Sequence, residues 1–329
     1  GILAEREWVK KCAEGREDEL RYCISCMNCF NVNPFSYEQT NCSVNPFALR
    51  EGSKRPIVQD GDGRLVAVIG AGPAGMEAAV TLKQRGFDVV VFDKRDEIGG
   101  NLHVAKKPPF KGKFEWAIDY YKSMAKKLNI TMKLGKEVTA QEVLALKPYS
   151  ILVATGSNVI SIPLEGLDQV QTVQAHDVLA NDMQFANKKV VVIGGGITGL
   201  ETALYINRQG TNQVSVVDML PEWPVDMLDM RYQNEALLEV RHCNDQGVAL
   251  FYNNKVVKFA DGKLFIESTK DGEVKELPAD VIVLSVGVKP NYALWQELLA
   301  SGHPSVWKAG DAIATGKINK AVLHGSKFG

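Results

Sequence analysis

The chain has 329 residues and carries 38 Lys and Arg against 39 Asp and Glu, so its formal net charge is −1. This length favours two or three domains, and the balanced charge gives no general attraction to nucleic acid or to an anionic membrane. Apolar runs such as 281–286 are far shorter than the roughly 20 residues of a spanning helix, and the N-terminus shows no signal-peptide pattern. Six cysteines are too few for a disulfide framework at this length. The composition therefore predicts a cytoplasmic protein with no nucleic-acid or membrane partner.

The first 60 residues show few of the patterns that predict regular secondary structure. Residues 4–21 alternate charged and apolar side chains at helical spacing, which predicts a helical lead-in. Residues 31–56 are rich in Asn, Pro and Ser, which predicts an irregular loop whose folding depends on a metal centre. Cys12 and Cys243 have no partner thiol at redox-motif spacing, so both are predicted to be structural.

Four further cysteines, Cys23, Cys26, Cys29 and Cys42, form the pattern C-x2-C-x2-C-x12-C. Three thiolates within seven residues can wrap one face of an iron-sulfur cluster, and a fourth thiolate after a short loop can complete the ligand shell. Structural zinc sites usually take their thiols from two separated C-x2-C pairs. The spacing therefore favours an iron-sulfur cluster over zinc as the group that these four residues hold.

Regular α/β structure is predicted from residue 65 onward. The apolar run 65–69 is typical of a buried parallel strand, and the glycine-rich segment 70–75, Gly-Ala-Gly-Pro-Ala-Gly, follows it directly. A helix is expected over 76–85, and a second buried strand over 89–92 ends at Asp93. In such a unit the glycines allow a dinucleotide pyrophosphate to approach the helix N-terminus, while the acid accepts hydrogen bonds from a ribose. The segment therefore predicts a dinucleotide site.

The same unit recurs 124 residues later, which indicates an internal duplication. The apolar run 190–193 leads into Gly-Gly-Gly-Ile-Thr-Gly at 194–199, the next helix is expected to end near Gly210, and a strand at 214–217 ends at Asp218.

Two further features accompany both copies. Glu77 in the first copy aligns with Glu201 in the second, and each copy is followed by an apolar strand that ends on glycine, at 151–156 and at 281–287. Asp218 is followed by Met, Leu, Pro and Glu, with no Arg or Lys to neutralise a 2′-phosphate, so the second site is predicted to prefer NADH over NADPH.

At this point the residues resemble a known family. The Cys23–Cys42 motif and the segments 70–79, 96–102, 107–109 and 307–311 together resemble the C-terminal half of the NADH:flavin oxidoreductases. This group includes 2,4-dienoyl-CoA reductase, enoate reductase and trimethylamine dehydrogenase. The resemblance implies an α/β fold of tandem Rossmann-like FAD and NAD domains, arranged as in flavoprotein disulfide reductases and preceded by a cysteine-ligated 4Fe–4S segment.

The implied domain order places the NAD domain as an insertion in the FAD domain. The expected divisions are an iron-sulfur segment and linker at 1–60, a first FAD part at 61–160, the NAD domain at 161–286 and a second FAD part at 287–329. The glycine-rich fingerprints and the resemblance together imply the following contacts. For FAD these are Gly70, Gly72, Pro73, Ala74, Gly75, Asp93, Lys94, Gly100, Asn101, Leu102, Val138, Ala154, Thr155, Gly156, Gly310 and Asp311. For NAD they are Gly194, Gly195, Gly196, Ile197, Thr198, Gly199, Asp218, Met219 and Gly287.

Members of the resembled family also carry an N-terminal (β/α)8 barrel that binds FMN and the organic substrate, and this chain contains none of it. Residues 8–21 resemble the exit from that barrel, and the chain begins Gly-Ile-Leu, so a fragment or a separate subunit is expected. The resemblance implies electron flow from NADH through FAD and the 4Fe–4S cluster to an FMN-containing domain or subunit that reduces an enoyl-type or related substrate. Hydride transfer to a flavin needs no obligatory general acid or base, so no catalytic residue is predicted. An oligomer is expected, and an electron-transfer protein is a second candidate partner.

Three alternatives stay open. An amine dehydrogenase-type module would hold ADP in the first site and pass electrons outward to an electron-transfer flavoprotein. The second is an NADPH-linked module like the small subunit of glutamate synthase, which also joins iron-sulfur cysteines to a tandem nucleotide module. Its cysteines follow a different spacing, and Asp218 argues against NADPH. The third is a non-redox nucleotide-binding or zinc-stabilised interaction module. No dithiol lies where disulfide reductases place one, so a thiol substrate is not expected.

Overall fold

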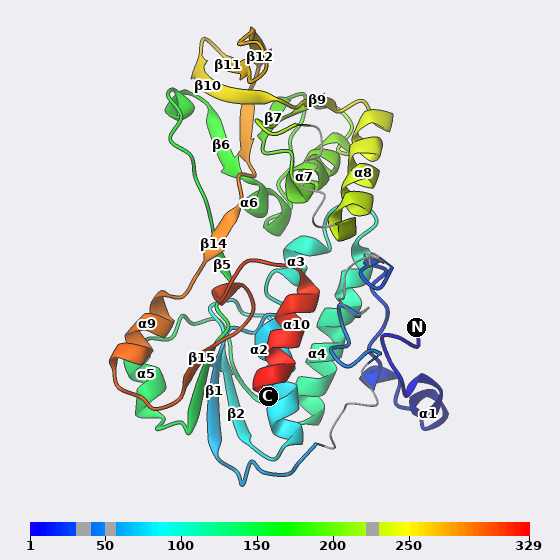
Figure 1. The fold of residues 1–329 in the computed structure, drawn as a ribbon, viewed down its shortest axis with the longest axis vertical. Helices are drawn as coiled ribbons and strands as arrows, with labels where there is room; N and C mark the ends of the chain where they lie inside the picture. The colour runs from blue at the N-terminus through cyan, green and yellow to red at the C-terminus, as the bar shows by residue number, and fades with distance from the viewer. Residues whose placement is uncertain (31–40, 50–56, 222–229) are drawn as a thin grey trace.

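The computed structural model describes residues 1–30, 41–49, 57–221 and 230–329. It is elongated, with one five-stranded sheet in each half and a narrow two-stranded link between the halves (Figure 1). No helix in these described ranges combines the length and the apolar character that crossing a membrane requires.

The first sheet is parallel and has the order β15-β4-β1-β2-β3. Its strands are β1 (Leu65–Ile69), β2 (Asp88–Phe92), β3 (Thr131–Lys133), β4 (Ser150–Val153) and β15 (Val306–Lys308). Alternate residues of β1 face two different cores, with Val66 and Val68 on one side and Ala67 and Ile69 on the other. Both faces are covered, and this explains why the strands read as continuous apolar runs.

Helices cover the two faces of this sheet. The helices α2 (Pro73–Gln84), α4 (Glu115–Lys127) and α10 (Ile318–Phe328) contribute to the Val66 core, and α5 (Ala140–Ala145) and α9 (Ala293–Ala300) to the opposite core. The helix expected over 76–85 begins three residues earlier, because Pro73 occupies its first turn behind the N-cap Gly72. Proline is favoured there since its missing N–H would have no partner within the helix.

The second sheet repeats the first. It is parallel, with the order β6-β13-β7-β8-β9. One face carries α6, α7 and α8, and the other packs against the antiparallel sheet β10-β11-β12. The strands of these two sheets are β6 (Gln171–Gln174), β7 (Lys189–Ile193), β8 (Gln213–Val217), β9 (Ala249–Phe251), β10 (Asn254–Ala260), β11 (Lys263–Ser268), β12 (Val274–Pro278) and β13 (Val281–Leu284). The helices are α6 (Ala175–Ala180), α7 (Ile197–Asn207) and α8 (Met230–Asp245).

The chain passes between the halves through two short paired strands. It leaves the first sheet through β5 (Ser157–Val159) and returns through β14 (Val288–Pro290), which pairs with β5 in antiparallel register. It then forms β15, which joins the first sheet beside β4. The first sheet is thus completed only after the second has been built, and the predicted α/β architecture with parallel sheets is confirmed.

The N-terminal segment is less regular than expected. The helical lead-in over 4–21 is reduced to α1 (Trp8–Ala13) and a single 3-10 turn (Glu17–Glu19), because Gly15 adopts a positive φ of 66° between them. Trp8 packs edge-on against Tyr22 at 5.1 Å between ring centroids, and Tyr22 contacts Trp116 of α4. Of the loop expected over 31–56, residues 41–49 form bends and turns, whereas 31–40 and 50–56 lie outside the described residues.

Short helical turns complete the described elements. They are α3 (Leu102–Ala105) and the 3-10 turns Gly112–Phe114, Leu167–Gln169 and Gly310–Ala312. The turns at 102–105 and 310–312 both lie beside the first glycine-rich loop, because Gly100 approaches Gly72 and Gly310 approaches Ala74.

Candidate functional site

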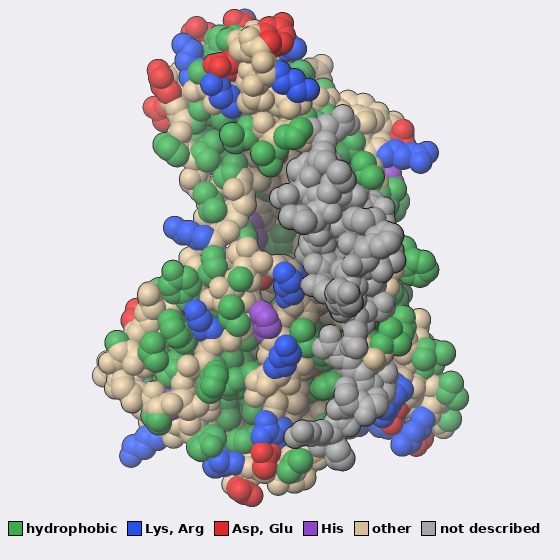
Figure 2. Space-filling model, in the orientation of Figure 1, with side chains coloured by type: hydrophobic (Ala, Val, Ile, Leu, Met, Phe, Trp, Pro, Cys, Tyr) green, Lys and Arg blue, Asp and Glu red, His purple; other side chains and the backbone are tan. Residues whose placement is uncertain are grey.

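One cavity of about 1120 Å³ is lined by residues of both halves. Its walls include Gly72 of the first glycine-rich loop, Gly196 of the second and Cys26 of the four-cysteine motif. Figure 2 shows this face of the molecule hollowed between the two halves. Pockets for one small ligand usually measure about 300–1,000 Å³, so the cavity is large enough for more than one group. Both loops lie at the carboxyl ends of parallel strands, where open α/β sheets bind ligands.

The first glycine-rich loop packs too tightly for side chains. Gly70 has a φ of +114°, and a Cβ atom there would lie 2.2 Å from the carbonyl oxygen of Ala154. A Cβ atom on Gly75 would lie 1.9 Å from the carbonyl oxygen of Gly70, so α2 packs directly on the turn that precedes it. A Cβ atom on Gly100 would lie 2.8 Å from the Cα atom of Gly72. A ligand can therefore approach the loop backbone from the cavity side, whereas neighbouring backbone atoms fill the space on the other side.

The second loop has the same geometry. Gly194 has a φ of +110°, and a Cβ atom there would lie 2.3 Å from the carbonyl oxygen of Ser285. A Cβ atom on Gly199 would lie 1.9 Å from the carbonyl oxygen of Gly194. The duplication seen in the sequence is therefore also a duplication of backbone contacts, with the strand-end corners at Ala154 and Ser285 in equivalent places.

Asp93 and Asp218 each tether their own loop. The Oδ2 atom of Asp93 accepts a hydrogen bond of 2.6 Å from the backbone N–H of Ala71, and its Oδ1 atom accepts one of 2.9 Å from the backbone N–H of Arg95. Asp218 accepts in the same way from the backbone N–H groups of Gly195 at 2.6 Å and Leu220 at 2.8 Å. A carboxylate offers about four lone-pair positions, so each acid retains acceptor capacity for a ribose hydroxyl.

The residues predicted to contact FAD lie together in the structure, although they come from six separate stretches of the chain. All but Gly75 line the cavity, and Gly75 lies behind the loop where α2 meets β1. The lining residues of this set are Gly70, Gly72, Pro73, Ala74, Asp93, Lys94, Gly100, Asn101, Leu102, Val138, Ala154, Thr155, Gly156, Gly310 and Asp311. Burial raises the pKa of Asp311, whose Oδ1 atom accepts a hydrogen bond of 3.1 Å from the backbone N–H of Gly316.

The residues predicted to contact NAD are divided. Gly196, Ile197, Thr198 and Gly287 line the cavity. The other five, Gly194, Gly195, Gly199, Asp218 and Met219, are not among its lining residues. Tyr252 lies beside Gly195, with its Cε1 atom 2.9 Å from the position of a Cβ atom there.

Several cavity residues were not predicted. Lys111 and Glu201 both line the cavity and form an ion pair that joins the first half of the molecule to α7. The His176 ring lies 3.4 Å from the side-chain oxygen of Asn101 and also contacts the guanidinium group of Arg95. The alignment of Glu201 with Glu77 was the one sequence signal that could have identified this acid. Lys111 and His176, which lies in α6, carry no such signal.

The cysteine segment reaches the same cavity. Cys26, Asn28 and Ser43 line it, and the Cys26 sulfur lies 3.2 Å from the Ser43 hydroxyl. Burial, together with neighbouring thiols of the motif, raises the pKa values of Cys29 and Cys42. Each of these two thiols therefore lies near other thiols of the motif. Across the parts of the chain that the structure describes, however, no three His, Cys, Asp or Glu side chains are arranged to hold a metal ion.

Comparison with known proteins gives a family and several relatives. The family described as pyridine nucleotide-disulphide oxidoreductase matches residues 64–323. The chain is 34% identical to an NADH oxidase of Thermoanaerobacter brockii, over 99% of this chain and 50% of the relative. It is 32% identical to a bilirubin reductase of Mediterraneibacter gnavus strain CC55_001C, over 98% of this chain and 49% of the relative.

Comparison with solved structures also finds a relative. A solved structure of a 2-naphthoyl-CoA reductase in complex with 2-naphthoyl-CoA matches with a TM-score of 0.90 and 28% identity, over 99% of this chain and 49% of that chain. This chain thus spans about half the length of the relatives that it matches. The family match covers both nucleotide units, with their two parallel sheets and two glycine-rich loops. The chain therefore belongs to the pyridine nucleotide-disulphide oxidoreductase family, which implies an oxidoreductase that binds FAD and NAD(P)H.

Proposed function

We propose that this chain is the NADH-dependent electron-transfer part of a larger flavin and iron-sulfur oxidoreductase. Electrons would pass from NADH through FAD to a 4Fe–4S cluster on Cys23, Cys26, Cys29 and Cys42. An FMN-containing (β/α)8 domain or subunit would receive them and reduce an enoyl-type or related substrate. The observation that carries this proposal is the shared cavity, whose walls include both glycine-rich loops and Cys26.

Each half of the molecule presents a helix N-terminus that suits a dinucleotide cofactor. The N-cap residues of α2 and α7 are Gly72 and Gly196, and both line the cavity, so unpaired N–H groups at each helix start can meet a pyrophosphate. A flavin accepts two electrons as hydride and releases them one at a time, which is the conversion required between NADH and an iron-sulfur cluster. The chain's own contribution is to hold the two nucleotides in one cavity.

The cysteine segment supplies a fitting donor set. Cys29 and Cys42 each lie near other thiols of the motif, and Ser25 and Met27, the residues on either side of Cys26, adopt left-handed φ values of 55° and 57°. Cys26 is the one motif cysteine on the cavity wall, so it would mark the side of the cluster that faces the flavin.

The relatives support the reductive direction and a partner domain. Two of the three named above are called reductases, and each of the three is about twice the length covered here. We therefore include the FMN-binding domain or subunit in the proposal, with domain divisions at 1–60, 61–160, 161–286 and 287–329.

The proposed order of electron transfer, from NADH to FAD and then to the cluster, predicts that Cys29→Ala affects only the last step. NADH should still bleach the FAD absorbance at the parent rate, because the nucleotide loops are unchanged, while the electron paramagnetic resonance signal of the reduced cluster should be lost. Anaerobic stopped-flow absorbance, iron and sulfide analysis and rapid-freeze spectra measure these steps. Cys12→Ala, which changes a thiol of α1 outside the motif, is the matched control and should behave as the parent.

Three results would contradict the proposed electron transfer from NADH through FAD to the cluster. Loss of flavin reduction in Cys29→Ala with FAD still bound would place the cluster before the flavin. Bound ADP without flavin would favour the amine dehydrogenase-type module. Zinc without iron would favour the zinc-stabilised interaction module.

A second prediction concerns the choice between NADH and NADPH. Asp218→Asn removes the negative charge that repels a 2′-phosphate and weakens a charged hydrogen bond to the ribose. The ratio of kcat/KM for NADH to that for NADPH should fall roughly tenfold, equivalent to about 1.4 kcal/mol. Asp93→Asn is the matched control in the first copy, where the FAD-loaded protein should keep the parent ratio. An unchanged ratio in Asp218→Asn would remove the argument for NADH.

A further inference from the structure

A short segment of the first half reaches across to the second half. This segment, Lys-Pro-Pro-Phe-Lys at 107–111, runs between α3 and the 3-10 turn Gly112–Phe114. Its side chains contact α7 and α8 of the second half. In Figure 1 the two-stranded link β5–β14 lies to the left of α3, α7 and α8. The halves are therefore joined through this segment as well as through the link.

Phe110 has a backbone conformation that bulky residues rarely adopt. Its φ is +68°, in the left-handed region that favours glycine. Such strain persists where the surrounding structure enforces it, and it gathers at functional positions. Burial of the side chain explains little of it, because Phe110 is 74% exposed. The contacts that the ring makes with the second half account for it better.

The Phe110 ring contacts two helices of the second half. Its centre lies 4.5 Å from the guanidinium carbon of Arg208 and 5.4 Å from the centre of the His242 ring. Arg208 is the C-cap residue of α7, and His242 belongs to α8. A guanidinium group over an aromatic face is attracted by the quadrupole of the ring. The strained residue thus holds the end of α7.

The next residue holds the same helix near its start. Lys111 forms an ion pair with Glu201, in the second turn of α7, and both side chains are largely buried. The two contacts on α7, at Glu201 and at Arg208, are about 10 Å apart along the helix axis. Two contacts at that spacing fix the direction of α7 as well as its position. Because its N-cap Gly196 lines the cavity, the direction of α7 decides where the second glycine-rich loop faces.

The other end of the segment adds a third contact. Lys107 donates to Oδ2 of Asp182 at 2.5 Å, and the Tyr205 hydroxyl of α7 donates to Oδ1 of the same carboxylate at 3.2 Å. Lys107 therefore also reaches α7, through the Asp182 side chain. Two adjacent prolines lie between Lys107 and Phe110, and their rings fix φ at both positions. The contacts thus come from one stiff piece of chain.

We propose that the 107–111 segment, with Phe110 as its positioning residue, sets the direction of α7 and so makes the second nucleotide site face the first across the cavity. The reaction that it serves is hydride transfer from NADH to FAD, in which one hydrogen moves with both electrons and leaves NAD⁺ and reduced flavin. Misplacing two reacting groups by about 1 Å can lower a rate roughly a hundredfold. This inference rests on the proposed function, because it needs NADH in the second site and FAD in the first.

The test uses Phe110→Gly in the full chain loaded with FAD. Glycine suits the left-handed φ at this position, so the backbone can keep its path while the ring contacts are lost. In anaerobic stopped-flow absorbance, the limiting rate of flavin reduction at saturating NADH should fall roughly tenfold. The apparent Kd for NADH and the FAD content should stay at the parent values. Phe110→Tyr keeps the ring and should retain most of the parent rate.

A second measurement does not depend on activity. Met183 and Arg208 have backbone N–H groups that are hydrogen-bonded within the second half, next to the contacts of the segment. In the FAD-loaded protein without NADH, peptides that contain these residues should exchange hydrogen at least roughly threefold faster in Lys107→Met/Phe110→Gly than in the parent. Mass spectrometry measures the exchange. Reduction of the bound FAD by dithionite, which needs no second nucleotide site, should be unchanged in this variant.

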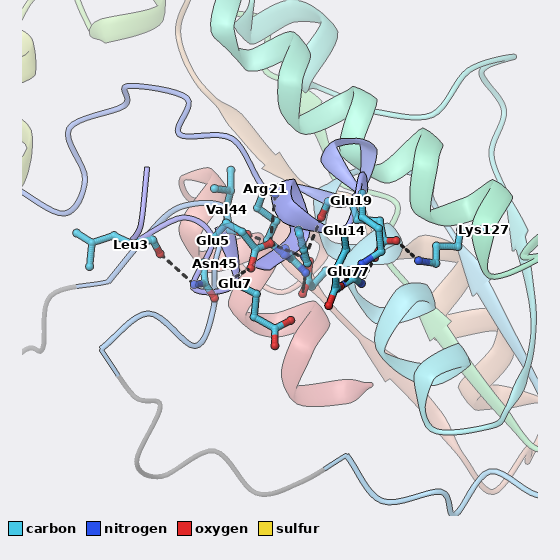
Figure 3. Close-up of polar contacts among 12 residues, drawn as sticks. Leu3, Glu5, Glu7, Glu14, Glu19, Arg21, Val44, Asn45, Glu77 and Lys127 are labelled. Atoms are coloured by element: carbon cyan, nitrogen blue, oxygen red, sulfur yellow. Dashed lines mark hydrogen bonds and ion pairs between the residues drawn. The ribbon is translucent and has the colours of Figure 1, made fainter. Parts of the chain in front are cut away.

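Lys127→Met is the matched control. It also removes a lysine from an ion pair, but its partner Glu19 lies in the N-terminal segment, away from the second half (Figure 3). The limiting rate and the hydrogen exchange should therefore match the parent. Lys107→Met alone decides the question if Phe110→Gly does not retain FAD. It breaks a more exposed pair and should lower the limiting rate in the same direction by less.

The outcomes separate the role of Phe110 from the proposed function. A parent protein that binds no FAD, or whose FAD is not reduced by NADH, overturns the proposed function. A parent that NADH reduces, with a Phe110→Gly variant of equal limiting rate, overturns only the role of Phe110. Unchanged hydrogen exchange in the double variant would do the same. An equal loss of rate in Lys127→Met, or an equal slowing of the dithionite reaction, would also overturn that role, because it would show a general effect on the flavin.

Discussion

Gly75→Ala is expected to abolish FAD binding. A Cβ atom at Gly75 would lie 1.9 Å from the carbonyl oxygen of Gly70, far inside contact distance, and both groups are backbone that cannot rotate away. The start of α2 must then move off β1, and the N–H groups that would meet the pyrophosphate move with it. FAD affinity should fall at least roughly a hundredfold, equivalent to about 2.7 kcal/mol. Flavin content after purification and fluorescence titration of the cofactor-free protein measure the loss.

The internal duplication supplies a matched variant in the second loop. Gly199→Ala places a Cβ atom 1.9 Å from the carbonyl oxygen of Gly194, the same clash in the other half. This variant should keep its FAD but lose reduction by NADH. Gly112→Ala, where nothing lies within 4 Å of the added atom, is the control for both and should behave as the parent. The reverse pattern, with flavin lost in Gly199→Ala and retained in Gly75→Ala, would exchange the two nucleotide assignments.

Arg21→Met alone should strongly destabilise the cofactor-free protein. It leaves the buried carboxylate of Glu77 without its cation, and breaking a buried ion pair in this way costs about 3–5 kcal/mol. Most of that loss should be recovered in Arg21→Met/Glu77→Gln. The uncompensated charge is then gone, and the Tyr121 hydroxyl, which donates to the Glu77 carboxylate in the parent, can donate to the amide oxygen of the introduced glutamine.

Urea unfolding followed by circular dichroism measures these differences. Lys127→Met, which breaks a more exposed pair with Glu19, should cost about 1 kcal/mol or less and serves as the comparison. A double variant as unstable as Arg21→Met would show that the unpaired charge is not the cause of the loss.

Much of the nucleotide-binding architecture could be predicted from local patterns. The apolar runs at 65–69 and 190–193 form central parallel strands, because residues buried on both faces must all be apolar. The loops at 70–75 and 194–199 take the expected conformations, because Gly70 and Gly194 adopt φ values open to glycine and rarely to other residues.

Local reasoning fails where several weak signals compete. Apolar spacing predicts that α2 begins at Met76, although Pro73 is well suited to the first turn of a helix. The same spacing predicts one helical lead-in over 4–21, although Gly15 divides it into two short pieces. Helical spacing alone does not decide whether so short a segment stays helical, because its stability comes from packing.

The sequence by itself determined the α/β class, the two glycine-rich loops and the spacing of the cysteines, because each depends on residues close together in the chain. It also determined the duplication, because the two copies can be aligned residue by residue. Only the tertiary structure decided that both loops and Cys26 share one cavity. It alone paired Arg21 with Glu77, 56 positions away, and Lys111 with Glu201, 90 positions away. The physical reason is that a charged side chain finds its partner only when packed elements bring the two together, and no local pattern specifies which elements will meet.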